Sequence, residues 1–161
     1  MKLQGHLSHM GFGRIALLLS TALVISGTAS ARQTTAAAKP SVTVYKSASC
    51  GCCKQWVAHM QAAGFTVKAL DVDDVEAPMK TYGVPLSLAS CHTALVGGYV
   101  LEGHVPAESV QRMLREKPAI AGLAVPGMPV GSPGMEVPGY KDPYSVVAFD
   151  KTGKTSVYER K

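Results

Sequence analysis

The chain has 161 residues, of which 47% are hydrophobic and 17% charged, a composition that fits one folded domain with one core. Its formal net charge is +5, yet the sequence contains neither the basic runs nor the interleaved aromatic residues that nucleic-acid binding requires, so nucleic acid is excluded as a partner. Three of the four cysteines lie within four positions, which makes a framework of two long-range disulfides a poor interpretation.

The N-terminal segment has the three parts of a secretory signal. Lys2 and Arg14 supply positive charge, residues 15–26 form a mostly apolar run, and Ala29-Ser30-Ala31 is an A-x-A cleavage site. The apolar run is shorter than the roughly 20 residues that span a bilayer. We therefore predict export with cleavage after Ala31 and no membrane attachment afterwards. Cleavage leaves 14 Lys and Arg against 11 Asp and Glu, a net charge of about +3.

The segment after the cleavage site is rich in threonine and alanine and has no apolar periodicity, which is typical of a flexible tether. The predicted organisation is a signal peptide at 1–31, a flexible lead-in at 32–40 and a single folded domain at 41–161.

The densest chemical motif is Ser49-Cys50-Gly51-Cys52-Cys53, which follows a predicted strand at 42–45. Four residues have the i, i+3, i+4, i+7 spacing of one helix face, namely Cys53, Trp56, Val57 and Met60. The cysteines therefore lie where a strand passes into a helix. Unpaired N–H groups and the helix dipole at such a position favour thiolate, the form that reacts and binds metal.

Two patterns overlap in this motif. Cys50 and Cys53 form a C-x-x-C pair suited to dithiol redox exchange. Cys52 projects to another side of the helix start, so three sulfurs would surround it, and this arrangement suits a metal. The alternative is a plain disulfide between Cys50 and Cys53 in an exported protein.

The pattern downstream predicts five more elements before residue 118. These are a strand at 65–70, a short helix at 75–82, strands at 93–96 and 99–101, and a helix that begins after Pro106. Pro78 either limits the short helix or lies in its first turn. Gly97-Gly98 between two apolar runs is typical of a hairpin. The order β-α-β-α-β-β-α predicts an α/β, thioredoxin-like fold with a central mixed sheet flanked by helices.

The C-terminal part departs from that plan. Residues 118–143 form a long loop rich in proline and glycine, and Met128 and Met135 each follow a Pro-Gly pair. Thioether is a soft ligand that suits Cu(I), although methionines also fill gaps over a core. Residues 144–149 and 155–158 are predicted to close the chain as a β-hairpin.

Several motifs in fixed order resemble those of a bacterial family long labelled a domain of unknown function, whose better-known members are the CopG-type periplasmic copper-resistance proteins. The resemblance covers about 42–158. The motifs are Cys50-Gly51-Cys52-Cys53 with Trp56, Gly83-Val84-Pro85, Ser90-Cys91-His92-Thr93-Ala94, Gly98-Tyr99, Glu102-Gly103-His104-Val105-Pro106 and the segment 127–136.

The resemblance implies a thioredoxin-like protein of the periplasm whose four cysteines bind copper, with redox exchange between copper and thiols. The implied ligands are Cys50, Cys52, Cys53 and Cys91. In thioredoxin-like domains the loop before the third strand faces the start of the cysteine helix, and Cys91 occupies that loop. The implied cargo is Cu(I), in one or several ions. The implied partners are copper ions, other periplasmic copper-handling proteins and a thiol reductant.

Three histidines need separate interpretation. His92, beside Cys91, is a candidate to ligate metal or to tune a thiolate, and His104 is a candidate ligand that could equally satisfy backbone groups of a turn. His59 lies off the apolar stripe of the first helix, so we expect it on the solvated surface. Trp56 and Tyr99 are expected in the core.

Three function classes compete. The first is a copper-binding protein with a thiolate cluster, which is redox-active in copper handling or resistance. The second is a thiol-disulfide oxidoreductase without a metal role, in which Cys50 attacks and Cys53 resolves. The third is a structural zinc protein, for which the C-x-C-C spacing is poor. Cys52 separates the first two classes, because simple dithiol exchange does not need it.

Overall fold

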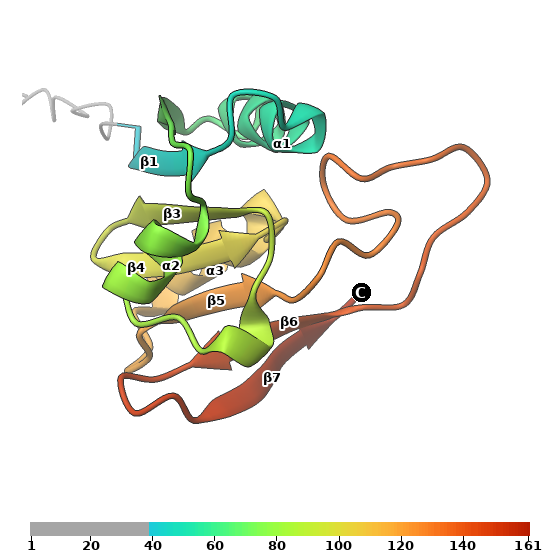
Figure 1. Ribbon diagram of the computed structural model, residues 1–161. Coiled ribbons are helices and arrows are strands. Elements are labelled where there is room, and N and C mark those ends of the chain that lie inside the picture. The colour runs from blue at the N-terminus through green and yellow to red at the C-terminus, as the bar shows by residue number, and fades with distance from the viewer. Residues whose placement is uncertain (1–38) are drawn as a thin grey trace, which may run out of the picture. The chain divides into compact units, whose positions relative to one another are not determined.

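A seven-stranded mixed sheet forms the centre of the structure, with strand order β2-β1-β3-β4-β5-β6-β7 (Figure 1). The computed structural model describes residues 39–161, so the predicted signal peptide and most of the predicted lead-in lie outside the described residues. Between residues 39 and 161 no helix is both long enough and apolar enough to cross a membrane.

The described elements keep the predicted order, with one additional 3-10 helix, and with one additional strand between the last predicted helix and the C-terminal hairpin. They are β1 (Ser41–Lys46), α1 (Gly51–Ala62), β2 (Thr66–Asp71), α2 (Glu76–Thr81), the 3-10 helix η1 (Leu86–Leu88), β3 (His92–Val96), β4 (Tyr99–Gly103), α3 (Ala107–Glu116), β5 (Gly122–Val125), β6 (Ser145–Phe149) and β7 (Thr155–Arg160).

The sheet combines parallel and antiparallel pairs. β1 runs parallel to β2 and antiparallel to β3, β3 and β4 form the predicted hairpin, and β4 runs parallel to β5. The last three strands, β5, β6 and β7, pair antiparallel. The predicted α/β class, with a mixed sheet flanked by helices, is confirmed.

A separate cluster of buried apolar side chains lies on each face of the sheet, so the prediction of one core is wrong. On one face, side chains of α1 and α3 such as Trp56, Met60 and Met113 pack against Val42 and Val44 of β1. On the other face, Met79 of α2 and Leu88 of η1 pack with Phe149 of β6. Burial on both faces fixes the ends of the central strands, and those ends carry the cysteines and histidines.

Two turn predictions are confirmed by backbone geometry. Gly97 and Gly98 have φ angles of 57° and 86°, which matches the type I′ geometry favoured between two antiparallel strands. Pro78 is the third residue of α2, where its missing N–H removes no intrahelical hydrogen bond.

The prediction of one continuous loop at 118–143 is wrong for its first part. Gly122–Val125 forms β5, a central strand whose four residues are all buried. A strand buried on both faces shows no alternation of apolar and polar residues, so its pattern cannot be distinguished from an apolar loop segment. The remainder of the segment crosses from β5 to β6 beyond the strand ends, as the orange loop in Figure 1.

Candidate metal centre

The start of α1 holds three sulfurs, as predicted. Cys50 is the N-cap residue, and its sulfur accepts a hydrogen bond of 3.3 Å from the N–H of Cys53. Cys50 and Cys53 are joined by a disulfide, with their Cα atoms 5.3 Å apart. The sulfur of Cys52 lies 3.4 Å from that of Cys50 and is a free thiol. The motif thus combines an oxidised C-x-x-C pair with one additional sulfur.

The fourth cysteine reaches this cluster from the sheet. Lys46, the last residue of β1, pairs with His92, the first residue of β3, so Cys91 lies beside the end of β1 from which the chain continues to α1. The sulfur of Cys53 is 3.6 Å from the carbonyl oxygen of Cys91. The sulfur atoms of all four cysteines lie within 4.8 Å of one another. Four sulfurs at this spacing form a soft donor set.

A second donor group shares Cys91. Its members, Cys91, His92 and His104, place one ligand atom each within 4.8 Å of one another. The sulfur of Cys91 is 2.9 Å from Nε2 of His104 and 3.4 Å from Nδ1 of His92. The structure therefore brings both candidate histidines to the cysteine cluster through Cys91.

The orientation of His104 is fixed by the loop after β5. Its Nδ1 lies 2.7 Å from the carbonyl oxygen of Pro133, and because a carbonyl can only accept, Nδ1 carries the proton. The lone pair of Nε2 then faces the sulfur of Cys91. Burial lowers the pKa of His104 and keeps its imidazole neutral, although the Pro133 carbonyl and Glu136 oppose this shift. A ligating histidine held by a carbonyl at its other nitrogen is a common arrangement in metal sites.

His92 is the more isolated of the two histidines. It is buried, and within residues 39–161 its Nε2 has no hydrogen-bond partner. Burial, together with the neighbouring His104, lowers the pKa of His92 to about 3, so the ring is neutral. Its ring lies 4.5 Å from that of Trp56 and 5.1 Å from that of His104. A neutral imidazole with an unpaired nitrogen is a potential ligand that hydrogen bonding has not satisfied.

The thiol of Cys91 keeps its proton in the metal-free site. Burial raises its pKa to about 12, and the adjacent sulfur of Cys52 adds to the shift because two neighbouring thiolates repel. The thiol can therefore donate to Nε2 of His104. Metal binding to such a thiol releases a proton, so affinity for metal rises with pH.

The proline- and glycine-rich loop contacts the site through its backbone. Gly134, with a φ angle of 88°, passes so close to α1 that an added Cβ would lie 2.7 Å from the carbonyl oxygen of Cys52. Met128 is 52% exposed and Met135 is half-buried. Their assignment as copper ligands stays a prediction, and the contribution that the structure shows is that of Pro133 and Gly134.

Two contacts could not be identified from the sequence. The prediction that His59 is solvated is wrong, because it is half-buried and its Nε2 accepts a hydrogen bond of 3.1 Å from the N–H of Ala107 at the start of α3. Pro133 orients His104 through its backbone carbonyl, and a backbone contact of this kind cannot be read from the residue types in a sequence. Trp56 is buried as predicted, and its indole N–H donates to the carbonyl of Val105.

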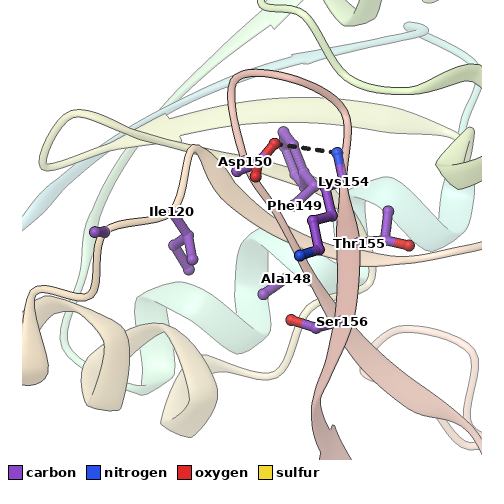
Figure 2. A pocket seen from close by; sticks show the side chains of 8 residues that line it. Ile120, Ala148, Phe149, Asp150, Lys154, Thr155 and Ser156 are labelled. Carbon is purple, nitrogen blue, oxygen red and sulfur yellow. Dashed lines mark hydrogen bonds between the residues drawn. The ribbon is translucent and has the colours of Figure 1, made fainter.

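A separate pocket of about 260 Å³ lies at the β6–β7 hairpin (Figure 2). Its lining residues are Ala119, Ile120, Ala148, Phe149, Asp150, Lys154, Thr155 and Ser156. This set includes none of the predicted ligands, so the chemistry of the cysteines and histidines is located elsewhere.

Comparisons with known proteins find one matching family model and similar solved structures. Residues 88–135 match the family described as "Protein of unknown function, DUF411". A solved structure titled "Copper resistance protein copG- Form 2" is similar at 43% identity and a TM-score of 0.73, over 76% of this chain and 98% of that chain. The structure titled "Copper resistance protein copG- Form 1" is similar at 44% identity and a TM-score of 0.72, with the same coverage. Curated proteins give no match. The chain therefore belongs to the CopG-type DUF411 family.

Proposed function

We propose that this protein binds copper as Cu(I) through the thiolates of its four cysteines and serves in copper handling or resistance in the periplasm. The observation that carries the proposal is that the four sulfur atoms, from two separate parts of the chain, lie within 4.8 Å of one another. Thiolate clusters favour Cu(I). The solved relatives at 43% and 44% identity are named copper resistance proteins, which supports copper as the cargo.

The proposed ligand set extends beyond sulfur. Nε2 of His104 and Nδ1 of His92 lie 2.9 Å and 3.4 Å from the sulfur of Cys91, so both nitrogens are positioned to ligate a metal held near Cys91. The donors at this end of the cluster are therefore mixed sulfur and nitrogen. Met128 and Met135 would add thioether ligands only if the loop brings their sulfurs inward.

The site is also proposed to be redox-active. The Cys50–Cys53 disulfide corresponds to the oxidised state, in which two of the four sulfurs cannot ligate copper as thiolates. When the pair is reduced, two Cu(II) ions can accept its two electrons, giving two Cu(I) ions, the disulfide and two protons. Copper oxidation state and cysteine oxidation state would thus change together.

A competition experiment tests the copper proposal. Anaerobically reduced protein, supplied with equal Cu(I) and Zn(II) and a Cu(I) chelator, should retain copper and little zinc. Cys91→Ser should lower Cu(I) affinity by about tenfold or more, since loss of even a supporting residue around a metal costs 10–100-fold. Preferential zinc retention, or a Cys91→Ser variant that competes like the wild type, would contradict the assignment.

The second candidate function is thiol-disulfide exchange without metal. The Cys50–Cys53 disulfide at the start of α1 favours it, because a C-x-x-C pair in that position suits exchange with another protein's thiols. This function predicts that Cys52→Ser and Cys91→Ser both retain full activity towards a disulfide substrate.

A further inference from the structure

The two sulfurs outside the disulfide form a pair of their own. Cys52 and Cys91 are both free thiols, and their sulfurs lie within 4.8 Å of each other. Cys52 belongs to the first turn of α1, whereas Cys91 directly precedes β3, so the pair brings together two elements that are far apart in the sequence. Both residues are only partly buried, which leaves them accessible to a small oxidant.

We infer that Cys52 and Cys91 close into a second disulfide, so that the fully reduced site holds four electrons instead of two. The inference rests on the proposed function, which supplies Cu(II) as the oxidant. Two S–H bonds break and one S–S bond forms between the sulfurs of Cys52 and Cys91. Two Cu(II) ions take one electron each and become Cu(I). Of the two protons released, the one from Cys91 faces Nε2 of His104, 2.9 Å away.

The second disulfide would change how the site holds its cargo. With only Cys50–Cys53 oxidised, Cys52 and Cys91 still offer two soft sulfur donors and the two histidines offer imidazole nitrogens. With both disulfides closed, no thiolate remains, and the bridge fixes the start of α1 to the segment before β3. We therefore expect copper to be held in the reduced and half-oxidised states and released in the fully oxidised state.

Tryptic cleavage distinguishes the two disulfides, because the lysines and arginines of the chain place Cys91 and the other three cysteines in different peptides. Cys50, Cys52 and Cys53 fall in one peptide, 47–54, and Cys91 falls in another, 81–112. A Cys50–Cys53 disulfide stays inside the first peptide. A bridge to Cys91 joins the two peptides and is visible as a new mass that reduction removes.

In the test, the mature protein is fully reduced, diluted and then oxidised with excess Cu(II) in the absence of oxygen. Bathocuproine disulfonate is present to bind the Cu(I) that forms and to measure its amount. Free thiols are then alkylated and the protein is digested without reduction. The inference predicts about four Cu(I) per chain, no alkylated cysteine, a monomer on a non-reducing gel and the joined 47–54/81–112 peptide. Cys52→Ser and Cys91→Ser should each halve the Cu(I) yield and lose the joined peptide.

The possible failures are separable. About two Cu(I) per chain, with Cys52 and Cys91 both alkylated, would overturn the second disulfide and leave the proposed copper–thiol exchange standing. A joined peptide that persists in Cys52→Ser, or that comes from disulfide-linked dimers, would also overturn it. No Cu(I) and four alkylated cysteines would instead overturn the redox part of the proposed function.

Discussion

At the scale of single residues, Glu102 of β4 is a buried carboxyl group beside the segment that carries Cys91. Its side chain is buried, and its two oxygens accept hydrogen bonds from the N–H of Ser90 and the hydroxyl of Thr93. Burial nevertheless dominates and raises the pKa of Glu102 to about 7. Because both partners flank Cys91, the carboxyl group supports the segment that carries that cysteine.

The free energy of unfolding should therefore fall as the pH rises through the range in which Glu102 loses its proton. The folded pKa lies above the unfolded value of 4.5, so the folded state binds more protons between these values and loses stability as pH rises from 4.5 to about 7. The loss is roughly 2–4 kcal/mol at 1.36 kcal/mol per pKa unit. Denaturant unfolding of metal-free protein should show it, and Glu102→Gln should remove it. If the free energy of unfolding of Glu102→Gln falls with pH as steeply as that of the wild type, Glu102 is excluded as the cause.

His59 should act in the opposite direction. Burial lowers its pKa from 6.5, so stability is complete above 6.5 and is lost as pH falls below that value. Protonation also removes the acceptor for the Ala107 N–H and places positive charge at the start of α3. Glu108 and Glu136 partly oppose the shift.

The matched variant for this prediction is His59→Gln, whose side-chain oxygen can still accept from Ala107 but does not titrate. Unfolding measured at pH 7.5 and 5.5 should show a larger loss at low pH for the wild type than for His59→Gln. Equal losses would mean that the hydrogen bond to Ala107 does not link this histidine to stability.

At the scale of elements, the loop between β5 and β6 contacts both His104 and the first turn of α1. Pro133 holds His104, and the next residue, Gly134, passes against the first turn of α1. An added Cβ at Gly134 would meet the Cys52 carbonyl oxygen at 2.7 Å and the Trp56 nitrogen at 2.9 Å, both of them backbone atoms that cannot move aside easily.

Gly134→Ala should therefore displace the loop. Gly139→Ala is the matched control, because Gly139 also has a positive φ angle, 76°, but has no atom within 4 Å of the added Cβ. The difference in free energy of unfolding between the two variants should be about 1–3 kcal/mol, the usual cost of overpacking. Only Gly134→Ala should also weaken Cu(I) binding, by about 10–100-fold, as expected when the support of a ligand is lost. If both substitutions have similar effects, the strain of placing alanine at a positive φ angle would explain them, and the predicted role of the Gly134 contact would be wrong.

The sequence predicted most elements because their patterns are local. Apolar spacing located α1, Gly97-Gly98 located the β3–β4 hairpin, and Pro106 located the start of α3. β5 was missed because four residues buried on both faces have no alternation. Likewise, the cysteine motif was visible as spacing, whereas the contact of Pro133 with His104 depends on a carbonyl brought in by tertiary packing.

At the scale of the whole molecule, the sheet brings the cysteines and His104 together at the same end of its neighbouring strands β1, β3 and β4. α1 follows β1, Cys91 precedes β3, and β1 and β3 are neighbouring antiparallel strands, so the C-terminal end of β1 meets the N-terminal end of β3. His104 follows β4, the next strand in the sheet. The topology therefore explains why residues spread from 50 to 104 lie together.

The maturation of the chain is a separate prediction at this scale. Residues 1–31 have the composition of a cleaved secretory signal, so the exported protein should begin at Arg32. Intact mass of the protein released from the periplasm by osmotic shock checks this. A species that retains residues 1–31, or that remains with the membrane fraction, would contradict both the cleavage and the compartment.

The central claim is that the four cysteines together hold copper, and copper K-edge X-ray absorption tests it most directly. Protein reduced and loaded with Cu(I) without oxygen should give the edge of Cu(I) and a first shell dominated by sulfur. In Cys91→Ser that shell should lose sulfur scattering, because one of the four sulfurs is gone. A first shell of nitrogen and oxygen alone, or a sulfur shell identical in wild type and Cys91→Ser, would contradict the claim.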